Sequence, residues 1–128
     1  MIATVYRVQD AEGRGPYRPG MSGRWCDPGH EARNPAVWDE TGPAAVETLP
    51  RGRHAGCGFL TLGALAAWFT GPELSALERL GYGVVRLPGA TIHARGGLQV
   101  MFWRDRPHTA GAKPVPWGSI HSDAAAAA

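Results

Sequence analysis

The sequence has few cysteines and no long apolar run. Two cysteines, Cys26 and Cys57, are too few for a disulfide framework, so we expect a protein of a reducing compartment. No apolar stretch approaches the roughly 18 residues that a membrane-spanning helix needs. The N-terminus also lacks the basic start and apolar core of a signal peptide. We therefore predict a cytoplasmic protein without a membrane partner, and the sequence leaves its oligomeric state open.

Lysine is almost absent as well. Lys113 is the one lysine among 13 basic residues, and the net charge is a modest +2. This charge is too low for a dedicated nucleic-acid binder, but the planar fork of arginine suits phosphate and carboxylate groups. The same bias towards arginine also arises from GC-rich coding. Length and a hydrophobic content of 44% predict one domain over residues 1–123, with the alanines at 124–128 outside the fold.

Apolar residues are scarce in a long segment near the start. Between residues 9 and 35 the chain places Arg14, Arg18 and Arg24 among glycines and prolines that block any long regular element. A loop of this length is uncommon inside a compact domain and is usually functional when it is ordered. The segment is therefore either disordered, or held in shape by a ligand or partner that favours positive charge.

The rest of the chain predicts an α+β domain. Apolar spacing and end signals indicate helices over 62–69 and 72–80, and Thr41 and Pro43 favour a short helix over 41–49. Strands are predicted over 2–8, 82–88, 90–95 and 98–104. The expected order is one N-terminal strand, a long Gly/Pro/Arg loop, two short helices and an antiparallel three-strand meander.

Four cysteine and histidine residues offer the ligand types of tetrahedral zinc. They are Cys26, His30, His54 and Cys57. Their spacings match no known zinc motif well, and a small core residue is the simpler interpretation of Cys57, so we assign no metal ligand. A thiol and a histidine in one chain do not by themselves indicate a nucleophile. The G-x-S-x-G, P-loop and G-x-G-x-x-G motifs are absent, which disfavours the standard serine hydrolase, P-loop NTPase and Rossmann classes.

Three short motifs follow one another in the first part of the chain. Tyr6-Arg7 ends the first predicted strand, and the stretches GRWCDPG at 23–29 and AVWDETGPAAVETL at 36–49 come after it. Together they resemble the pattern of RES-domain proteins and, more loosely, of the ADP-ribosyltransferase-like fold. The resemblance implies a cleft that binds NAD and a transfer of ADP-ribose to a host macromolecule.

The cofactor-binding residues implied by this resemblance are arginines and aromatics. Arg7, with Tyr6 beside it, would face the phosphates or the nicotinamide ribose of NAD, and Arg24 and Trp25 would form the wall of the cleft. A guanidinium can bind a diphosphate through paired hydrogen bonds, and an aromatic ring can stack on nicotinamide or adenine. From the residues alone, Arg7 can equally be a strand residue that faces solvent, and Trp25 a lid packed on the core.

The catalytic residues that the resemblance implies are Glu47 and Gln99. Glu47 would stand beside the reacting ribose and stabilise the positive charge that develops as nicotinamide leaves. A toxin-type transferase has a glutamate on its late strand where this chain has Gln99, which keeps a hydrogen bond but not the charge. The late serine of RES domains has no clear counterpart here; Ser119 is the late candidate, with Ser122 second. A binding pocket without turnover is the alternative.

The whole chain also resembles small proteins carried by bacteriophages and mobile elements. The blocks VYRVQDAEGRGPYRPG, CGFLTLGALAAWF and GGLQVMF carry this likeness. Such proteins include inhibitors of host defence systems. A second functional hypothesis is therefore a non-catalytic inhibitor whose arginine loop binds an acidic protein or a nucleic acid, and a zinc-stabilised small module is the third.

Overall fold

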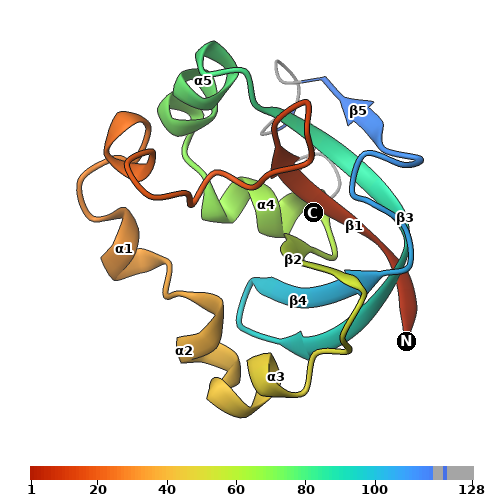
Figure 1. Ribbon diagram of the computed structural model, residues 1–128. Coiled ribbons are helices and arrows are strands. Elements are labelled where there is room, and N and C mark those ends of the chain that lie inside the picture. Colours follow the sequence, from red (N-terminus) through yellow and green to blue (C-terminus); the bar gives the residue numbers. More distant parts are fainter. Residues whose placement is uncertain (117–119, 121–128) are drawn as a thin grey trace.

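The structure, a computed structural model, describes residues 1–116 and 120 (Figure 1). The strands are β1 (Ile2–Gln9), β2 (His54–Phe59), β3 (Gly83–Arg95), β4 (Gln99–Arg104) and β5 (Lys113–Val115). The helices are α1 (His30–Arg33), α2 (Val37–Thr41), α3 (Pro43–Glu47), α4 (Leu62–Trp68) and α5 (Gly71–Arg79), with a 3-10 turn η1 at Ser22–Arg24. The alanines at 124–128, Ser119 and Ser122 lie outside the described residues.

Four of the strands close into a small antiparallel barrel. β1 pairs with β2, β2 with β4 and β4 with β3, and β3 pairs again with β1, so the ring is complete. β5 pairs with the start of β3 as a fifth strand. The predicted α+β arrangement, with a lone first strand and a three-strand meander, is therefore wrong.

Two local features explain the error. β2 has the sequence HAGCGF, whose glycines and lack of alternation do not indicate a strand. Pro88 and Gly89, which predicted a break between two strands, instead lie inside the continuous strand β3. The register slips here between Ala3 and Val5 of β1, and Gly89 has φ +69°, as expected of a β-bulge that accommodates a residue without an N–H donor.

The barrel closes where two strands approach very closely. β1 and β2 are paired at Tyr6 and Phe59. A Cβ atom on Gly58 would lie 2.8 Å from the carbonyl oxygen of Tyr6 and 3.3 Å from the ring of Phe102. Any larger residue at position 58 would push β1 and β2 apart, so packing requires glycine here.

Helices α4 and α5 confirm the predictions over 62–69 and 72–80. Thr61 caps α4 by accepting a hydrogen bond from the N–H of Ala64, and Thr70 and Glu73 form a capping box at the start of α5. α4 packs on β1 and β2, and Leu65 is fully buried in the core that both helices share with the barrel. Burying such a side chain contributes about 2 kcal/mol, so packing supports these short helices.

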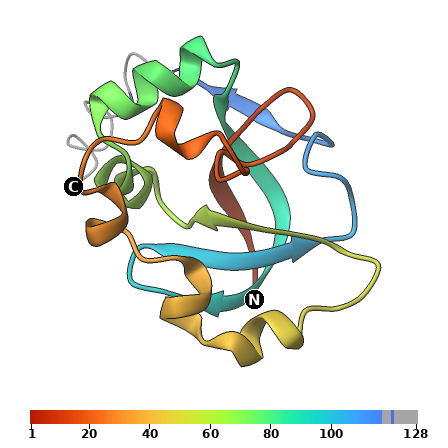
Figure 2. The ribbon, with the colours of Figure 1, turned by 60° about the vertical axis from the view of Figure 1, so that its left-hand side comes forward.

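Three shorter helices, α1, α2 and α3, follow one another along one side of the barrel towards the hairpin that joins β3 and β4 (Figures 1 and 2). α2 contacts both of these strands. The helix predicted over 41–49 is replaced by α2 and α3, which Gly42 separates with φ +88°. In the described part of the chain, every helix is too short or too polar to cross a lipid bilayer.

Candidate ligand-binding site

The first part of the opening loop is folded on an aspartate. Asp10 accepts hydrogen bonds of 2.9 Å from the backbone N–H of Glu12 and from the backbone and Nε of Arg14. Burial by itself would raise the pKa of Asp10, but these hydrogen bonds and the Arg14 charge outweigh it and lower the pKa. Arg18 Nη1 lies 3.7 Å from the same carboxylate. The loop therefore neutralises part of its own positive charge.

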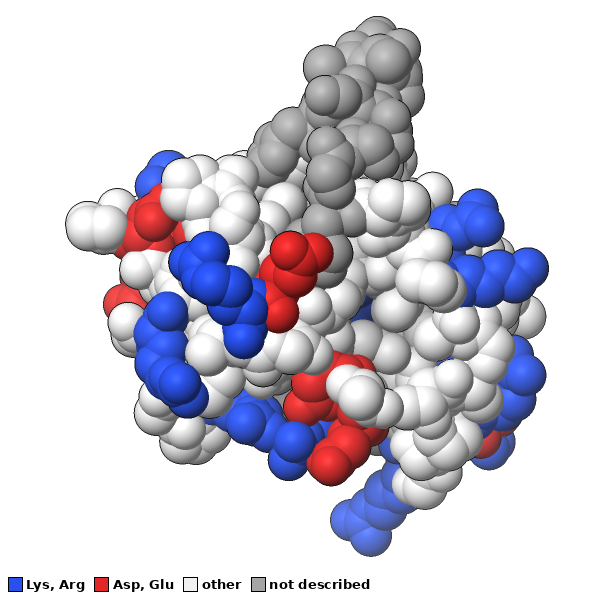
Figure 3. Space-filling model, turned by 90° about the horizontal axis from the view of Figure 1, so that it is seen from above, with Lys and Arg blue, Asp and Glu red and all other residues white. Residues whose placement is uncertain are grey.

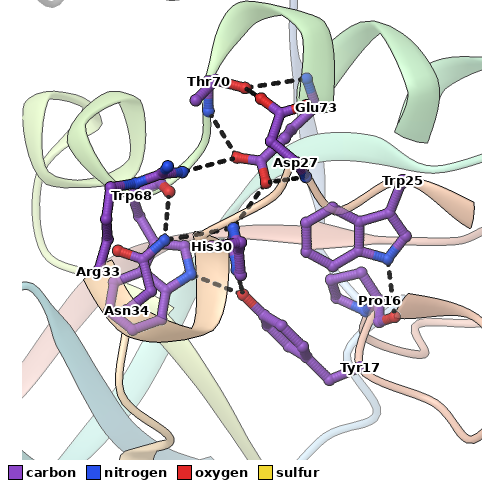
Figure 4. A network of polar contacts seen from close by, with 10 residues as sticks. All are labelled: Pro16, Tyr17, Trp25, Asp27, His30, Arg33, Asn34, Trp68, Thr70 and Glu73. Carbon is purple, nitrogen blue, oxygen red and sulfur yellow. Dashed lines mark hydrogen bonds and ion pairs between the residues drawn. The ribbon is translucent and has the colours of Figure 1, made fainter. Parts of the chain in front are cut away.

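A buried glutamate of α5 fixes the next part of the loop (Figure 4). The side chain of Glu73 is fully buried, and its Oε2 accepts hydrogen bonds from the N–H of Asp27 at 2.9 Å and from Nδ1 of His30 at 2.7 Å. Its Oε1 accepts from the N–H of Thr70 at 2.9 Å, and Arg33 Nη2 lies 3.7 Å from it. One carboxylate thus joins the loop, α1 and α5.

His30 extends this network towards the end of α4. Its Nε2 lies 2.7 Å from the hydroxyl of Tyr17, and Nε1 of Trp68 donates to the same hydroxyl at 2.7 Å. Because Nδ1–H of His30 donates to Glu73, its Nε2 accepts a hydrogen bond from the Tyr17 hydroxyl. These two partners therefore set the tautomer of His30. Burial raises the pKa of Tyr17 well above its usual value, so this proton is retained.

Arg7 is buried under the loop and is held by neutral acceptors. Its Nη1 donates to the carbonyl of Cys57 at 2.8 Å, its Nε to Gln9 Oε1 at 3.2 Å and its Nη2 to the carbonyl of Gly13 at 3.4 Å. Gly56 makes room for the guanidinium, because a Cβ there would lie 2.9 Å from Nη1. Burial lowers the pKa of Arg7. A buried cation that still has spare N–H donors attracts an anion.

A cavity of about 260 Å³ adjoins Arg7, between the loop, β2 and the end of α4. Its described lining combines basic and aromatic side chains and includes no aspartate or glutamate. These side chains are Arg7, Arg18, Tyr17, Phe59, Trp68 and Phe69. Nε of Arg18 is buried without a hydrogen-bond partner. The cavity therefore offers guanidinium N–H donors and aromatic rings, which suits a planar anion.

Two of the residues predicted for a site, Arg7 and Gln99, line this same cavity. Gln99 is the first residue of β4 and is buried. Its Nε2 donates to the carbonyl of Pro35 at 2.9 Å and to Glu40 Oε1 at 3.1 Å. These bonds leave its carbonyl oxygen available as an acceptor, since the amide nitrogen is committed to the chain.

The other predicted residues lie elsewhere. Tyr6 is half-buried against the core, and Trp25 is a buried core residue whose Nε1 donates to the carbonyl of Pro16 at 3.2 Å. Arg24 is exposed at the end of η1, and Glu47 is exposed at the end of α3. Neither is among the described residues that line the cavity.

Tyr17 and Trp68 were not predicted as site residues from the sequence. They are 51 positions apart and meet through the indole hydrogen bond. A tryptophan on the apolar side of a predicted helix is usually a core residue, and Tyr17 stands among loop residues of no regular pattern. The sequence offers one signal for this pair, because the N–H of a buried indole needs an acceptor. That signal does not identify the residue that supplies the acceptor.

Neither cysteine is activated as a nucleophile. Burial raises the pKa of Cys57, and the nearby charge of Arg7 offsets this only in part. Burial, followed by the charge of Glu73, raises the pKa of Cys26 to about 11. Both thiols stay protonated near neutral pH, which does not favour thiolate chemistry.

His108 is held in its neutral form close to Arg7. Its Nε2 donates to the carbonyl of Ala55 at 3.1 Å, and its Nδ1 is buried without a partner. Burial lowers the pKa of His108 to about 4, and the charges of Arg7 and Arg104 add to this effect against the Ala55 hydrogen bond. A proton on this ring would therefore be disfavoured in the folded state.

This neutral histidine predicts a loss of stability in mild acid. In the unfolded chain the group binds a proton near pH 6.5, whereas in the fold its pKa is about 4, so the unfolded state takes up the proton first. Stability is then full above about pH 6.5 and falls towards pH 4, by about 1–2 kcal/mol once partial exposure is allowed for. Urea unfolding at several pH values measures it. His108→Gln, which keeps a donor for Ala55, should flatten the slope; an unchanged slope contradicts the assignment.

A comparison with protein families identifies a family for this chain. The family model described as "Bacteriophage T4 Y00F protein" matches residues 1–115. The chain therefore belongs to this bacteriophage family, which confirms the resemblance to phage proteins. The match gives no evidence of a relation to RES domains or ADP-ribosyltransferases. Neither the curated proteins nor the solved structures contain a match to it.

Proposed function

We propose that this protein binds a nucleotide in the cavity beside Arg7 and Arg18. The single observation that supports the proposal is a cavity lining with two guanidinium groups, four aromatic rings and no described carboxylate. Phosphate oxygens would take the spare N–H donors of Arg7 and Nε of Arg18, and a base or nicotinamide ring would pack on the aromatic wall. NAD is the ligand that the resemblance to RES domains suggests, and it has both chemical parts.

The size of the cavity limits how much of NAD enters. Ligand pockets usually measure about 300–1,000 Å³. A cavity of about 260 Å³ fits one nucleotide half of a dinucleotide, with the other half outside. We therefore infer that a mononucleotide is enough to fill this site.

The transfer of ADP-ribose finds less support than binding does. That reaction needs a carboxylate beside the ribose, whereas Glu47 is exposed on α3 and is not among the described lining residues. Gln99 lines the cavity and can hydrogen-bond a ribose hydroxyl, but it carries no charge. We propose binding without turnover as the activity of this cavity, and assay of released nicotinamide tests this part separately.

A ligand titration tests the binding proposal. NAD, nicotinamide mononucleotide, ADP-ribose, AMP and inorganic phosphate are added in turn, and heat of binding and thermal unfolding are measured. We expect at least one nucleotide to raise the unfolding temperature with its concentration, because it binds the folded state alone. Arg18→Ala should weaken binding at least about tenfold, the usual effect of losing one charge-assisted hydrogen bond.

A matched variant controls for charge. Arg24→Ala removes an exposed arginine of the same loop that does not line the cavity, and should leave the affinity unchanged. Equal weakening in Arg24→Ala and Arg18→Ala would show attraction by net charge alone. No stabilisation by any of these nucleotides at millimolar concentration would contradict the proposal.

Binding of a host macromolecule through the arginine loop is the alternative function. Arg7 is buried, and Arg14 and Arg18 lie against Asp10, so the loop presents less free positive charge than its sequence indicates. The face of the molecule seen from above the view of Figure 1 has basic side chains at both margins and acidic side chains among them (Figure 3). This mixture gives weak attraction to a nucleic acid, so we place nucleotide binding first.

A further inference from the structure

A second hollow lies beside α1 and is not part of the Arg7 cavity. Its volume is about 420 Å³, and its described lining includes Cys26, Asp27 and His30. The nucleotide proposed above makes no use of it. Its lining combines a thiol, a carboxylate and an imidazole, which are the side-chain types that bind metal ions.

Two residues that line this hollow, Cys26 and His30, meet the buried Glu73 behind it. One ligand atom each of Cys26, His30 and Glu73 lies within 4.8 Å of the others. Thiolate, imidazole and carboxylate are the ligand types that zinc uses in proteins. His54 and Cys57, which the sequence grouped with Cys26 and His30, stand on β2 and are not part of this described cluster. The buried Glu73 replaces them.

The separations are close to those around a bound ion. Zinc bonds of about 2.0 Å to nitrogen and oxygen and 2.3 Å to sulfur place tetrahedral ligands about 3.3–3.6 Å apart. Nδ1 of His30 and Oε2 of Glu73 are 2.7 Å apart, joined by a hydrogen bond. An ion that replaces this hydrogen would separate them by about 0.6 Å more, and the half-buried side chain of Cys26 would move inwards to it.

Surrounding groups hold two of these ligands, His30 and Glu73 (Figure 4). An ion at Nδ1 of His30 requires the ring proton on Nε2, so the hydrogen bond between Nε2 and the hydroxyl of Tyr17 would reverse, with Nε2 donating. The N–H of Thr70 holds Oε1 of Glu73, which leaves Oε2 on the side of His30. Metal-binding histidines and carboxylates are normally fixed by such outer hydrogen bonds. Binding a cation would therefore replace the His30–Glu73 hydrogen bond and draw Cys26 inwards, while the outer contacts of Glu73 stay in place.

We propose that Cys26, His30 and Glu73 bind one zinc ion whose fourth position opens to the 420 Å³ hollow, and that the Cys26 thiol releases its proton to solvent on binding. Three protein ligands with one open position are typical of zinc sites that hold a water molecule or a small ligand. The open position would face Asp27, which lines the hollow and is able to accept a hydrogen bond from a zinc-bound water. The zinc site and the nucleotide cavity are separate proposals with separate tests, although Tyr17 contacts His30 and lines the cavity.

Titration with cobalt(II), in a chain without a histidine tag, tests the zinc site. Cobalt(II) takes the place of zinc and reports a thiolate ligand by an intense charge-transfer absorption. We expect one cobalt ion per chain, released by added zinc, with this absorption present. In Cys26→Ser the absorption should vanish and the affinity should fall at least about tenfold.

Cys57→Ser is the matched control, because Cys57 is the second thiol and lies outside the cluster. It should keep the absorption and the affinity of the parent chain. Cys26→Ala serves as a second variant, and circular dichroism confirms that each variant is folded. Any of three results would overturn the proposal. The absorption could survive in Cys26→Ser and Cys26→Ala, it could be lost in Cys57→Ser, or the parent chain could bind no cobalt at millimolar concentration.

Discussion

Replacing Glu73 by alanine is expected to lower the free energy of unfolding by about 3–5 kcal/mol, or the midpoint of thermal unfolding by about 10–20 °C. The carboxylate is fully buried and accepts hydrogen bonds from the backbone of Asp27 and Thr70 and from His30. Each donor left without an acceptor costs about 1–3 kcal/mol, and the capping box of α5 is lost as well. Urea and thermal unfolding measure the change.

Glu78→Ala is the control for this variant. Glu78 lies on the same helix and is exposed, so its replacement should change stability by less than about 0.5 kcal/mol. The loop should also become accessible in Glu73→Ala, seen as faster hydrogen exchange at Asp27 and His30. A loss of stability similar to that of Glu78→Ala would show that the Glu73 network does not hold the loop.

Gly58→Ala is expected to cost about 2–3 kcal/mol by forcing the barrel open. The added Cβ would lie 2.8 Å from the carbonyl oxygen of Tyr6, a backbone atom that cannot rotate away, and close to Phe102. The strain falls on the Tyr6–Phe59 pair, at which β1 and β2 are joined. Denaturant unfolding measures the cost, and amide exchange in β1 and β2 locates it.

Gly63→Ala provides a matched change in the next element. Gly63 lies in α4, and the nearest atom to an added Cβ, Oγ1 of Thr61, is 3.8 Å away. Alanine should therefore stabilise the protein by about 0.4–1 kcal/mol through the entropy of the unfolded chain. If Gly58→Ala were as stable as the parent chain, close contact of β1 and β2 would not be what selects glycine at position 58.

The loop and the cavity are physically linked through one side chain. Tyr17 receives the indole hydrogen bond of Trp68, contacts His30 and lines the Arg7 cavity. The network around Glu73 therefore positions an aromatic wall of the proposed nucleotide site. The arginine-rich loop is held by acceptors within the chain, so a ligand is not needed to give it shape.

Of the residues that the sequence predicted for a site, Arg7 and Gln99 line the cavity, and they were predicted through a resemblance between short motifs. The capping role of Glu73 is a local one, because an acidic residue in the first turn of a helix is visible in the sequence. That it also accepts bonds from Asp27 and His30, some 43 to 46 residues away in the chain, has no local signature. Glu47 matched a motif, but its helix α3 carries it to the surface.

The sequence by itself determined the local elements: the first strand, both capped helices and the strand around Phe102, because caps, apolar spacing and β-branched residues act over a few neighbouring positions. The tertiary structure alone decided that β2 joins β1 to β4 and that β3 continues through Pro88 and Gly89 to close the ring. Strand closure and buried polar networks depend on which distant segments meet, and the two glycines of β2 are explained by what they touch, the Tyr6 carbonyl and the Arg7 guanidinium.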